Sequence, residues 1–464
     1  MVNWHRWSIT GVFGCALSAL IYAHGLGVVE VYAKVKPSPD ACKTALKAFA
    51  GHTDQPNCKV IHAASSKVRL RWLSATHQLA AAWLDADTAQ AVIEWYEFNT
   101  GGLHTNSLGV AGNTFGDISR FNTLRPTADS LAPWFVTEAT KKLATAVQVH
   151  DAYHPIVVAI IDSGVNFEGS LADVPKWTNP RELGGDGLDN DANGYADDVH
   201  GWDFVETGVS SIFDDTTTPD NNPADRLGHG TAVAAIVAKT VGDAFSPYLR
   251  IMPLRVASGA GGGGSVEPAA LAEAIYYATD NGADIINISL AGNQYYKLIE
   301  DALFYAMGRG VKVVAAAGNT GGAVMFPASV PGVLAVGAAD SRGGVWSGSA
   351  TGSAVDLYAP GVNMLTELGV NTFYLSQDGT SFAAPVVTGV LAMLTSFGQG
   401  NGCTVAVGGF FKQLPPSKLM GDWLGGHATK VESVILSGRD MQSQWNQNTL
   451  ICGANEVTVN ALMR

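Results

Sequence analysis

Residues 156–164 read Ile156-Val-Val-Ala-Ile-Ile-Asp-Ser-Gly164, an unbroken apolar run followed by an acid and a glycine turn. A strand with one face in water alternates apolar and polar residues, whereas a strand covered on both faces is apolar throughout. The run at 156–161 therefore predicts a strand of a parallel sheet that lies between two layers of helices.

The same pattern recurs along the chain. Further apolar runs at 251–256, 284–290, 311–317 and 333–338 alternate with helical stretches at 231–239, 267–281 and 296–309. This alternation predicts an α/β fold with a doubly wound, mostly parallel sheet and helices on both faces. Sites of such sheets lie at the carboxyl ends of the strands, so we expect functional residues directly after the apolar runs.

The composition excludes several classes of protein. Of the 464 residues, 47% are hydrophobic and 15% are charged, whereas long disordered chains are rich in charge and poor in apolar residues. The 53 glycines follow no three-residue period, which excludes a collagen. The net charge of −13 gives no general attraction to phosphates, so we expect no nucleic-acid partner.

The first residues are typical of an export signal. Residues 8–23 carry no charge and follow a short segment that contains Arg6, as in secretory signals. Small residues permit cleavage after Gly25 or after Ala33, and we assign residues 1–33 to the signal. The protein is therefore expected to be secreted, or to lie in the periplasm or the cell envelope.

Two alternatives for this segment stay open. Residues 7–29 lack Asp, Glu, Lys and Arg over a length that spans a bilayer, which is compatible with an uncleaved anchor. The second alternative is lipid attachment at Cys15. We expect a membrane contact only if the segment stays uncleaved.

Four cysteines follow the signal, namely Cys42, Cys58, Cys403 and Cys452. An even number of cysteines in an exported chain favours two disulfides. Proximity along the chain favours Cys42–Cys58 and Cys403–Cys452, although four cysteines allow three pairings.

A serine at the start of a helix is the first candidate catalytic group. Residues 378–385 read Asp378-Gly-Thr-Ser-Phe-Ala-Ala-Pro385 and precede an apolar helical run at 386–394. Ser381 would lie at the helix N-terminus, where free N–H groups stabilise developing negative charge. A serine hydroxyl needs a base to act as a nucleophile, and without one an N-capping role explains it equally well.

Partners for this serine are present in the sequence. His229 lies between two glycines, which leaves space for a substrate backbone. Asp162 ends an apolar strand, where a carboxylate is costly to bury unless it is used. Asn319 follows the run 315–318 at the end of another strand, and its NH2 group is suited to an oxyanion. Each residue alone has a structural explanation, but the combination favours nucleophilic catalysis.

Together these motifs resemble the subtilisin-like serine proteases, or subtilases (the peptidase S8 family). The order Asp, His, Ser is that of subtilisin, which is a worked case of this triad. The resemblance rests on residues 158–164, 228–231, 284–290, 316–319, 326–329, 355–361 and 379–385. We therefore assign residues 129–464 to a subtilisin-like catalytic domain with an insertion near 399–425.

The resemblance implies an exported serine endopeptidase that hydrolyses peptide bonds through an acyl-enzyme intermediate. It implies that Ser381 is the nucleophile and His229 the base, that Asp162 orients the imidazole, and that Asn319 donates to the oxyanion. Protein or peptide substrates are expected to bind as an extended strand. The expected substrate-binding residues are Ser289, Leu290 and Ala291 in one segment and Gly261, Gly262 and Gly263 in another. The family has glycine in place of Ala291, so we expect a narrower or shifted pocket.

Residues 34–128 are expected to form a pro-segment or an accessory region with a linker. Subtilases often carry a pro-segment that assists folding and blocks the cleft, although the usual pattern of such segments has no clear match here. Alternating residues predict a strand at 66–73, and the stretch 77–98 favours one or two helices. No catalytic chemistry is seen in this region.

Residues 186–198 form an acidic loop with the spacing of a calcium loop. From Asp189 onward the spacing matches the first nine positions of an EF-hand loop. His200 stands where the bidentate glutamate is expected, so a further carboxylate is needed, and Asp198 is a candidate. The expected ligands are Asp189, Asp191, Asn193, Tyr195 and Asp197. We expect a structural calcium ion and no organic cofactor, and a solvated acidic turn is the alternative.

Two other functions stay open at this stage. One is a non-catalytic binding protein on the subtilase fold, because a fold does not by itself determine a function. The other is a sedolisin-type acid peptidase, which shares the fold but replaces the histidine with acidic residues. His229 and Asn319 both argue against the acid peptidase.

Overall fold

The computed structural model describes residues 28–48, 57–73, 93–98, 103–104, 154–206, 218–258, 265–342, 344–367, 374–400, 403–405, 449–452 and 455–458. The chain divides into two compact units, residues 1–102 with 296–298 and residues 103–295 with 299–464. The predicted export signal lies almost wholly outside the described residues, which begin at Val28.

The N-terminal unit contains a four-stranded antiparallel sheet in the order β2-β3-β1-β4. Its strands are β1 (Val28–Val35), β2 (Asn57–His62), β3 (Lys67–Leu73) and β4 (Ile93–Phe98). Helix α2 (Ala41–Ala48) contacts the sheet. A disulfide joins Cys42 of α2 to Cys58 of β2, which is the first of the two predicted pairings.

Strand β4 corrects the helix predicted for residues 77–98. Residues 93–98 read Ile93-Glu-Trp-Tyr-Glu-Phe98 and pair with β1. The β-branched and aromatic residues of this stretch suit a pleated, half-buried surface, and that preference outweighed the helical pattern. Residues 77–92 lie outside the described residues.

Strand β1 also bears on the N-terminal boundary. It lies between β3 and β4, and Val31 and Ala33 are fully buried. Cleavage after Ala33 would remove residues 28–33 from the middle of the sheet. Cleavage after Gly25 would leave β1 intact, and the position of the cleavage point stays a prediction.

The larger unit is built on a seven-stranded sheet in the order β14-β13-β12-β11-β6-β8-β7, and every pair of neighbours is parallel. The strands are β6 (Ile156–Asp162), β7 (Trp202–Asp203), β8 (Leu249–Arg255), β11 (Ile285–Ile288), β12 (Lys312–Ala316), β13 (Leu334–Ala339) and β14 (Leu357–Pro360). The predicted apolar runs are thus strands of one parallel sheet. The strand order reverses between β6 and β11, and a reversal of this kind is where ligands bind in open α/β sheets.

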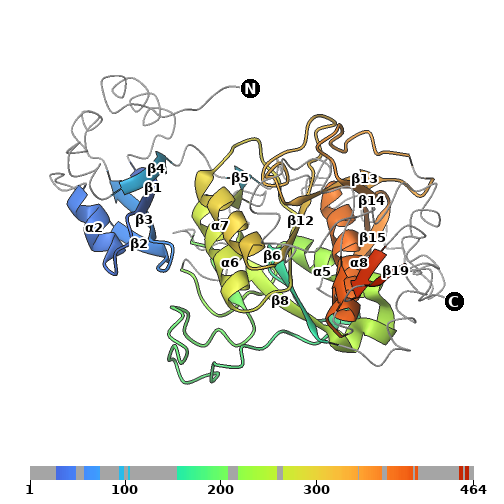
Figure 1. Ribbon diagram of the computed structural model, residues 1–464, viewed down its shortest axis with the longest axis horizontal. Coiled ribbons are helices and arrows are strands. Elements are labelled where there is room, and N and C mark those ends of the chain that lie inside the picture. The colour runs from blue at the N-terminus through green and yellow to red at the C-terminus, as the bar shows by residue number, and fades with distance from the viewer. Residues whose placement is uncertain are drawn as a thin grey trace. The chain divides into compact units, whose positions relative to one another are not determined.

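Helices cover both faces of this sheet, as predicted. They are α5 (His229–Phe245), α6 (Pro268–Asp280), α7 (Lys297–Gly308) and α8 (Thr380–Gly400). Figure 1 shows α6 and α7 on one side of the sheet and α5 with α8 on the other. Helix α8 is apolar around its circumference because α5 covers one side of it and the sheet covers another. A Cβ at Gly389 would lie 2.8 Å from Cβ of Thr240 in α5, so glycine is needed for this close packing.

Smaller elements complete the larger unit. They are the 3-10 turns Gly169–Leu171 and Ser246–Tyr248, the sheet of β5 (Leu103–His104), β10 (Ser265–Val266) and β9 (Ala257–Ser258), the hairpin of β15 (Met364–Glu367) and β16 (Tyr374–Gln377), and the sheet of β17 (Cys403–Val405), β18 (Thr449–Cys452) and β19 (Asn455–Thr458). Within the described residues, no helix combines the length and the apolar character needed to cross a bilayer.

The second predicted cysteine pair lies in the C-terminal sheet. Strands β17 and β18 are antiparallel, and their register makes Cys403 and Cys452 direct partners. This register is compatible with the predicted disulfide, which stays a prediction. Most of the insertion predicted near 399–425 lies outside the described residues.

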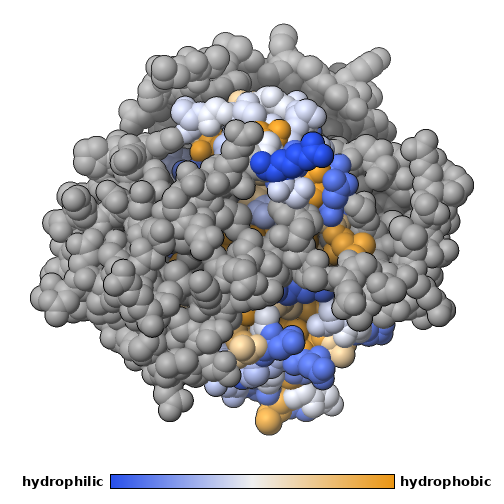
Figure 2. Space-filling model, turned by 90° about the vertical axis from the view of Figure 1, so that its right-hand side faces the viewer, coloured by the Kyte–Doolittle hydropathy of each residue, from blue (hydrophilic) through white to orange (hydrophobic). Residues whose placement is uncertain are grey.

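Large apolar side chains exposed at the surface of the described residues are scattered. They are Val60, Leu183, Leu188, Tyr295 and Val345. On the face shown in Figure 2, hydrophilic and hydrophobic residues are interspersed within the described part of the surface. This part of the surface therefore gives no broad apolar area for a partner.

Candidate active site

The carboxyl end of β6 and the start of α5 bring Asp162 and His229 together. Nδ1 of His229 lies 2.7 Å from Oδ1 of Asp162, and the backbone N–H of Ser163 donates to the same oxygen at 2.7 Å. Both side chains are buried. Because a carboxylate only accepts, Nδ1 is the protonated nitrogen of the neutral imidazole and Nε2 carries the lone pair.

The surroundings of His229 favour its charged form. Burial lowers the pKa of the imidazole, but the charge and hydrogen bond of Asp162, followed by the charge of Asp225, outweigh it. The pKa of His229 therefore lies above its ordinary value. The imidazole is thus suited to take up a proton during a reaction.

Ser381 lies at the start of α8 with its side chain buried. Its Oγ donates to the carbonyl of Ser289 at 3.1 Å, and Oγ of Ser289 donates to the carbonyl of Ser381 at 2.8 Å. The ring of Phe382, the next residue, lies 5.6 Å from the ring of His229 between centroids. The structure therefore brings Ser381 to the edge of the sheet where Asp162 and His229 meet.

The structure shows no hydrogen bond between Ser381 and Nε2 of His229. Within the part of the chain that the structure describes, Nε2 of His229 is buried and has no hydrogen-bond partner. The hydroxyl of Ser381 is turned toward Ser289 instead. Catalytic hydrogen bonds are often poorly aligned without substrate, so this geometry is compatible with a resting site.

Asn319 follows β12 and is held by the residue before Ser381. Its Oδ1 accepts from the N–H of Thr380 at 2.9 Å and from Oγ1 of Thr380 at 2.7 Å. Oγ1 of Thr380 also accepts from the N–H of Gly318 at 3.1 Å. These bonds fix the amide with its carbonyl toward Thr380 and its NH2 group on the opposite side.

The glycines beside His229 have a different role from the predicted one. Gly228 caps α5 in the left-handed region, with φ of 80°, a conformation that favours glycine. A Cβ at Gly230 would overlap the carbonyl of Gly164. These glycines therefore serve the local backbone and its packing, and Gly230 leaves no space for a substrate.

The predicted substrate-binding residues are only partly described. Ser289, Leu290 and Ala291 follow β11 and are buried. Gly261, Gly262 and Gly263 lie outside the described residues. The strand that follows these glycines, β10, pairs on one side with β9 and on the other with the extended residues of β5.

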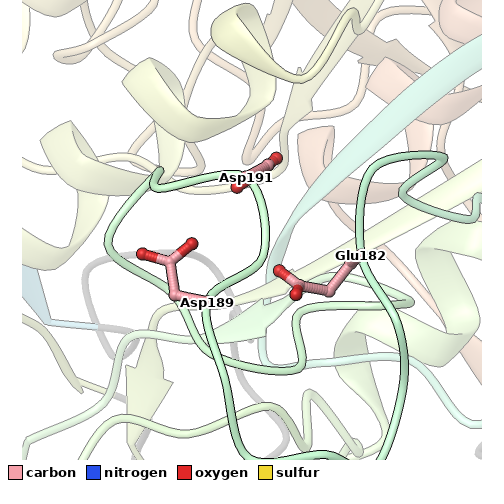
Figure 3. A group of neighbouring side chains, drawn as sticks. All are labelled: Glu182, Asp189 and Asp191. Atoms are coloured by element: carbon pink, nitrogen blue, oxygen red, sulfur yellow. The ribbon is translucent and has the colours of Figure 1, made fainter.

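The acidic loop gathers a different set of carboxylates from the predicted one. Glu182, Asp189 and Asp191 each offer one oxygen, and these oxygens lie within 4.8 Å of one another. Figure 3 shows the Glu182 side chain pointing toward the loop that carries the two aspartates. Oε1 of Glu182 accepts from the N–H of Asn190, whereas its Oε2 is buried without a hydrogen-bond partner in the described structure. Burial raises the pKa of Glu182, and the neighbouring carboxylates of Asp198 and then Asp191 raise it further, although the bond from Asn190 opposes them.

Asn193 and Tyr195 stay predicted ligands, and the acidic residues 197 and 198 make hydrogen bonds of their own. Asp197 accepts from the backbone N–H groups of residues 185, 186 and 187, so its carboxylate closes a turn. Asn193 Oδ1 accepts from the N–H of Tyr195, and the Tyr195 ring packs 5.1 Å from that of Trp202. Asp198 is buried and accepts from Asn179, Asn193 and Tyr277. The structure therefore keeps Asp189 and Asp191 in the candidate metal group and adds Glu182, but does not bring Asp197 into it.

Two residues of these sites were missed by the sequence analysis. Glu182 lies seven residues before Asp189, outside the motif spacing. Asp225, a buried acid four residues before His229, is the second charge that acts on the imidazole. An acid so close to a candidate base was a signal that the sequence did contain.

Comparison with known proteins supports the same family. The sequence model of the subtilase family matches residues 154–407, which is more than half of the chain. A thermophilic serine proteinase of Bacillus sp. (strain AK1) is 35% identical over 250 residues, which cover 53% of this chain and 53% of that protein. The chain thus spans about half the length of this relative.

Two further relatives align over more of their own length. Thermitase of Thermoactinomyces vulgaris is 37% identical over 207 residues, covering 43% of this chain and 68% of thermitase. Subtilisin DY of Bacillus licheniformis is 35% identical over 201 residues, covering 41% of this chain and 70% of that protein. With the parallel sheet and the matched region in agreement, the chain belongs to the subtilase family.

Proposed function

We propose that this protein is a serine endopeptidase in which Ser381, His229 and Asp162 form the catalytic triad. The observation that carries the proposal is the 2.7 Å bond between His229 and Asp162 at the edge of the sheet where α8 begins, with Ser381 in its first turn. Family membership supports serine endopeptidase chemistry in general. The roles of the individual residues belong to the proposal.

The acylation step begins when Ser381 leaves its bond to Ser289. Its Oγ attacks the carbonyl carbon of the scissile peptide bond, and its proton passes to Nε2 of His229. Asp162 stabilises the imidazolium that forms. His229 then gives the proton to the leaving amine as the C–N bond breaks, and an ester of Ser381 remains.

Deacylation repeats this sequence with water. His229 removes a proton from the attacking water, the water oxygen adds to the ester carbonyl, and the proton returns to Oγ of Ser381 as the acid product leaves. In both steps a tetrahedral oxyanion forms. The NH2 group of Asn319 and the backbone N–H of Ser381 would stabilise it, and the bonds from Thr380 orient Asn319 for this task.

Substrates are proposed to bind as extended peptides beside β10 and the segment 289–291. The pairing of β5 with β10 supports this proposal, because two extended residues pair antiparallel with that edge. A pro-segment role for residues 34–128 is part of the proposal; of that region, residues 103 and 104 pair with β10 within the larger unit. The narrower pocket expected from Ala291 is part of this proposal.

A structural calcium ion is proposed for the acidic loop. The donor set fits, because carboxylate oxygens are the ligands that calcium prefers. Oε2 of Glu182 is buried without a hydrogen-bond partner in the described structure, and a cation would compensate its charge. Glu182, Asp189 and Asp191 would hold the ion. Its contribution would be to neutralise the cluster and to fix the loop, with no part in peptide hydrolysis.

Export is proposed together with this function. The uncharged segment at 8–23 and the disulfide between Cys42 and Cys58 both suit an oxidising compartment outside the cytoplasm. N-terminal sequencing of the mature protein would identify the cleavage point, which we expect after Gly25.

The proposed activity is tested by peptide hydrolysis. Purified protein should cleave casein and a fluorogenic peptide, and Ser381→Ala should reduce kcat by about 10⁶-fold, the loss seen when subtilisin loses its nucleophile. Equal rates for wild type and Ser381→Ala would refute the proposal and favour a non-catalytic role for the fold.

A further inference from the structure

Asp225 is a buried carboxylate whose two oxygens are filled with hydrogen bonds. Its Oδ1 accepts from Ser163 Oγ, Leu227 N and Gly228 N at 2.8, 2.9 and 2.8 Å. Its Oδ2 accepts from the N–H and Oγ1 of Thr231 at 2.8 and 2.7 Å. Burial raises the pKa of Asp225, although these bonds favour its charged form.

These hydrogen bonds lie on both sides of His229, the proposed base, along the chain. The donors at Leu227, Gly228 and Thr231 lie on both sides of His229 along the chain, so one carboxylate fixes the whole turn 225–231. Because this turn leads into α5, its position sets the orientation of the His229 side chain.

Ser163 links this turn to the end of β6. Its Oγ donates to Asp225 and accepts from the N–H of Gly230 at 2.9 Å, while its own N–H donates to Asp162. The close contact of Gly230 with the Gly164 carbonyl leaves little space for the two segments to separate. Asp225 and Ser163 therefore clamp together the backbones that carry His229 and Asp162.

Asp225 also acts on the imidazole through its charge. The charged groups that act on His229 are Asp162 from β6 and Asp225 from the turn before α5, while α8 presents the uncharged ring of Phe382. The protonation of His229 therefore reports on the charge of Asp225 separately from its hydrogen bonds.

We propose that Asp225 is a positioning residue for proton transfer, which clamps the turn of His229 onto the Asp162–Ser163 strand end and adds a second negative charge beside the imidazole. The proposal rests on the proposed peptidase function and deepens it. It assigns Asp225 no contact with the substrate.

Two variants separate the clamp from the charge. Asp225→Asn retains the size of the side chain but removes its charge. Its NH2 group cannot accept hydrogen bonds, so the N–H and O–H donors that now bond to one oxygen of Asp225 would lose their acceptor. Ser163→Ala breaks the link to β6 and leaves the charge in place. A misplacement of about 1 Å can cost on the order of 100-fold in rate, so we expect both variants to lower kcat at least about tenfold, with a much smaller change in KM.

The pH profile tests the charge of Asp225 separately from the clamp, which kcat tests. Loss of the Asp225 charge makes the imidazolium less favourable, so the acid limb of kcat/KM should move to lower pH in Asp225→Asn and stay in place in Ser163→Ala. The same shift should appear when the His229 imidazole is titrated by NMR without substrate. If Asp225→Asn does not fold, the kcat of Ser163→Ala decides the claim of a clamp.

The matched control is Asp356→Asn. Asp356 accepts from one backbone N–H, that of Ala335, and precedes β14 at the amino ends of the strands, the edge of the sheet opposite to Asp162. This variant should keep kcat within about twofold, the range expected of a change outside the site.

Unchanged kcat in Asp225→Asn and Ser163→Ala, even with lower thermal stability, would overturn the clamp. An unchanged acid limb and an unchanged His229 titration in Asp225→Asn would overturn the role of the charge. A wild type that hydrolyses no peptide would refute the peptidase function instead, and the NMR titration would still test the effect of the Asp225 charge on the pKa of His229.

Discussion

Nδ1 of His229 lies 2.7 Å from Oδ1 of Asp162, although the two residues are 67 positions apart in the chain. The contact forms because β6 ends at Asp162 and α5 begins at His229 on the same edge of the sheet. It fixes the tautomer of the imidazole and leaves the lone pair of Nε2 on the side where we propose that it takes up the proton of Ser381. The account of this protein as a peptidase depends on this relationship.

Asp162→Asn should nearly abolish hydrolysis while the fold is kept. The amide would favour the wrong imidazole tautomer, and we expect kcat to fall by about 10⁴-fold, as in other enzymes with this triad. Steady-state kinetics with a fluorogenic peptide measure the loss, and circular dichroism checks the fold. A fall of less than about tenfold would mean that Asp162 does not orient the base.

Activity should fall in mildly acidic solution. The pKa of His229 lies above its ordinary value of 6.5 because the carboxylates of Asp162 and Asp225 outweigh the effect of burial. Since only the neutral imidazole accepts the serine proton, kcat/KM should decrease as the pH falls through that raised pKa. A pH–rate profile of the wild type measures this. Full activity maintained well below pH 6.5 would contradict the role of His229 and favour acid-peptidase chemistry.

Asn319→Ala should lower kcat far more than it changes KM. Loss of an oxyanion donor costs about 10²–10³-fold in kcat, as measured in subtilisin. The substrate ground state does not need this donor, so its binding should be nearly unaffected. Equal effects on kcat and KM would indicate that Asn319 supports only the local bonds to Thr380.

Chelation should lower thermal stability if calcium occupies the acidic loop. Removal of the ion would leave Glu182, Asp189 and Asp191 to repel one another, so the midpoint of unfolding should fall with EDTA and recover with added calcium. Glu182→Gln should reduce this response, whereas Asp186→Asn, in the same loop but outside the group, should retain it. The same midpoint with and without EDTA in the wild type would identify the loop as a solvated acidic turn.

The parallel sheet could be predicted because a strand that is buried on both faces is apolar throughout its length. Ile156-Val-Val-Ala-Ile-Ile161 has no polar residue, and the chemistry-bearing Asp162 follows it directly. Periodicity failed at Ile93–Phe98, where alternation was weak and pairing with β1 made the segment a strand. Such pairing is a tertiary effect that a short window of sequence does not contain.

Residues of the candidate sites that lie in family motifs could be predicted from the sequence, whereas residues that loop folding brings into the sites could not. Motif spacing located Asp162, His229, Ser381 and Asn319, because the fold family fixes where each lies along the chain. Glu182 depends on how its loop folds back and is marked by no spacing rule, whereas Asp225 was marked only by its closeness to His229 along the chain. Asp197 fitted the spacing of a calcium loop, but its carboxylate closes a backbone turn. Competition between backbone donors and a cation for one carboxylate is decided only in the folded loop.

The central claim is that Ser381 is a nucleophile activated by His229, and covalent labelling tests it most directly. Mature protein treated with a serine-directed phosphonate should gain the mass of one adduct, and peptide mapping should locate it on Ser381. His229→Ala should slow this labelling, and Ser381→Ala should abolish it. Absence of an adduct on correctly folded wild-type protein, or an adduct at another residue, would contradict the account.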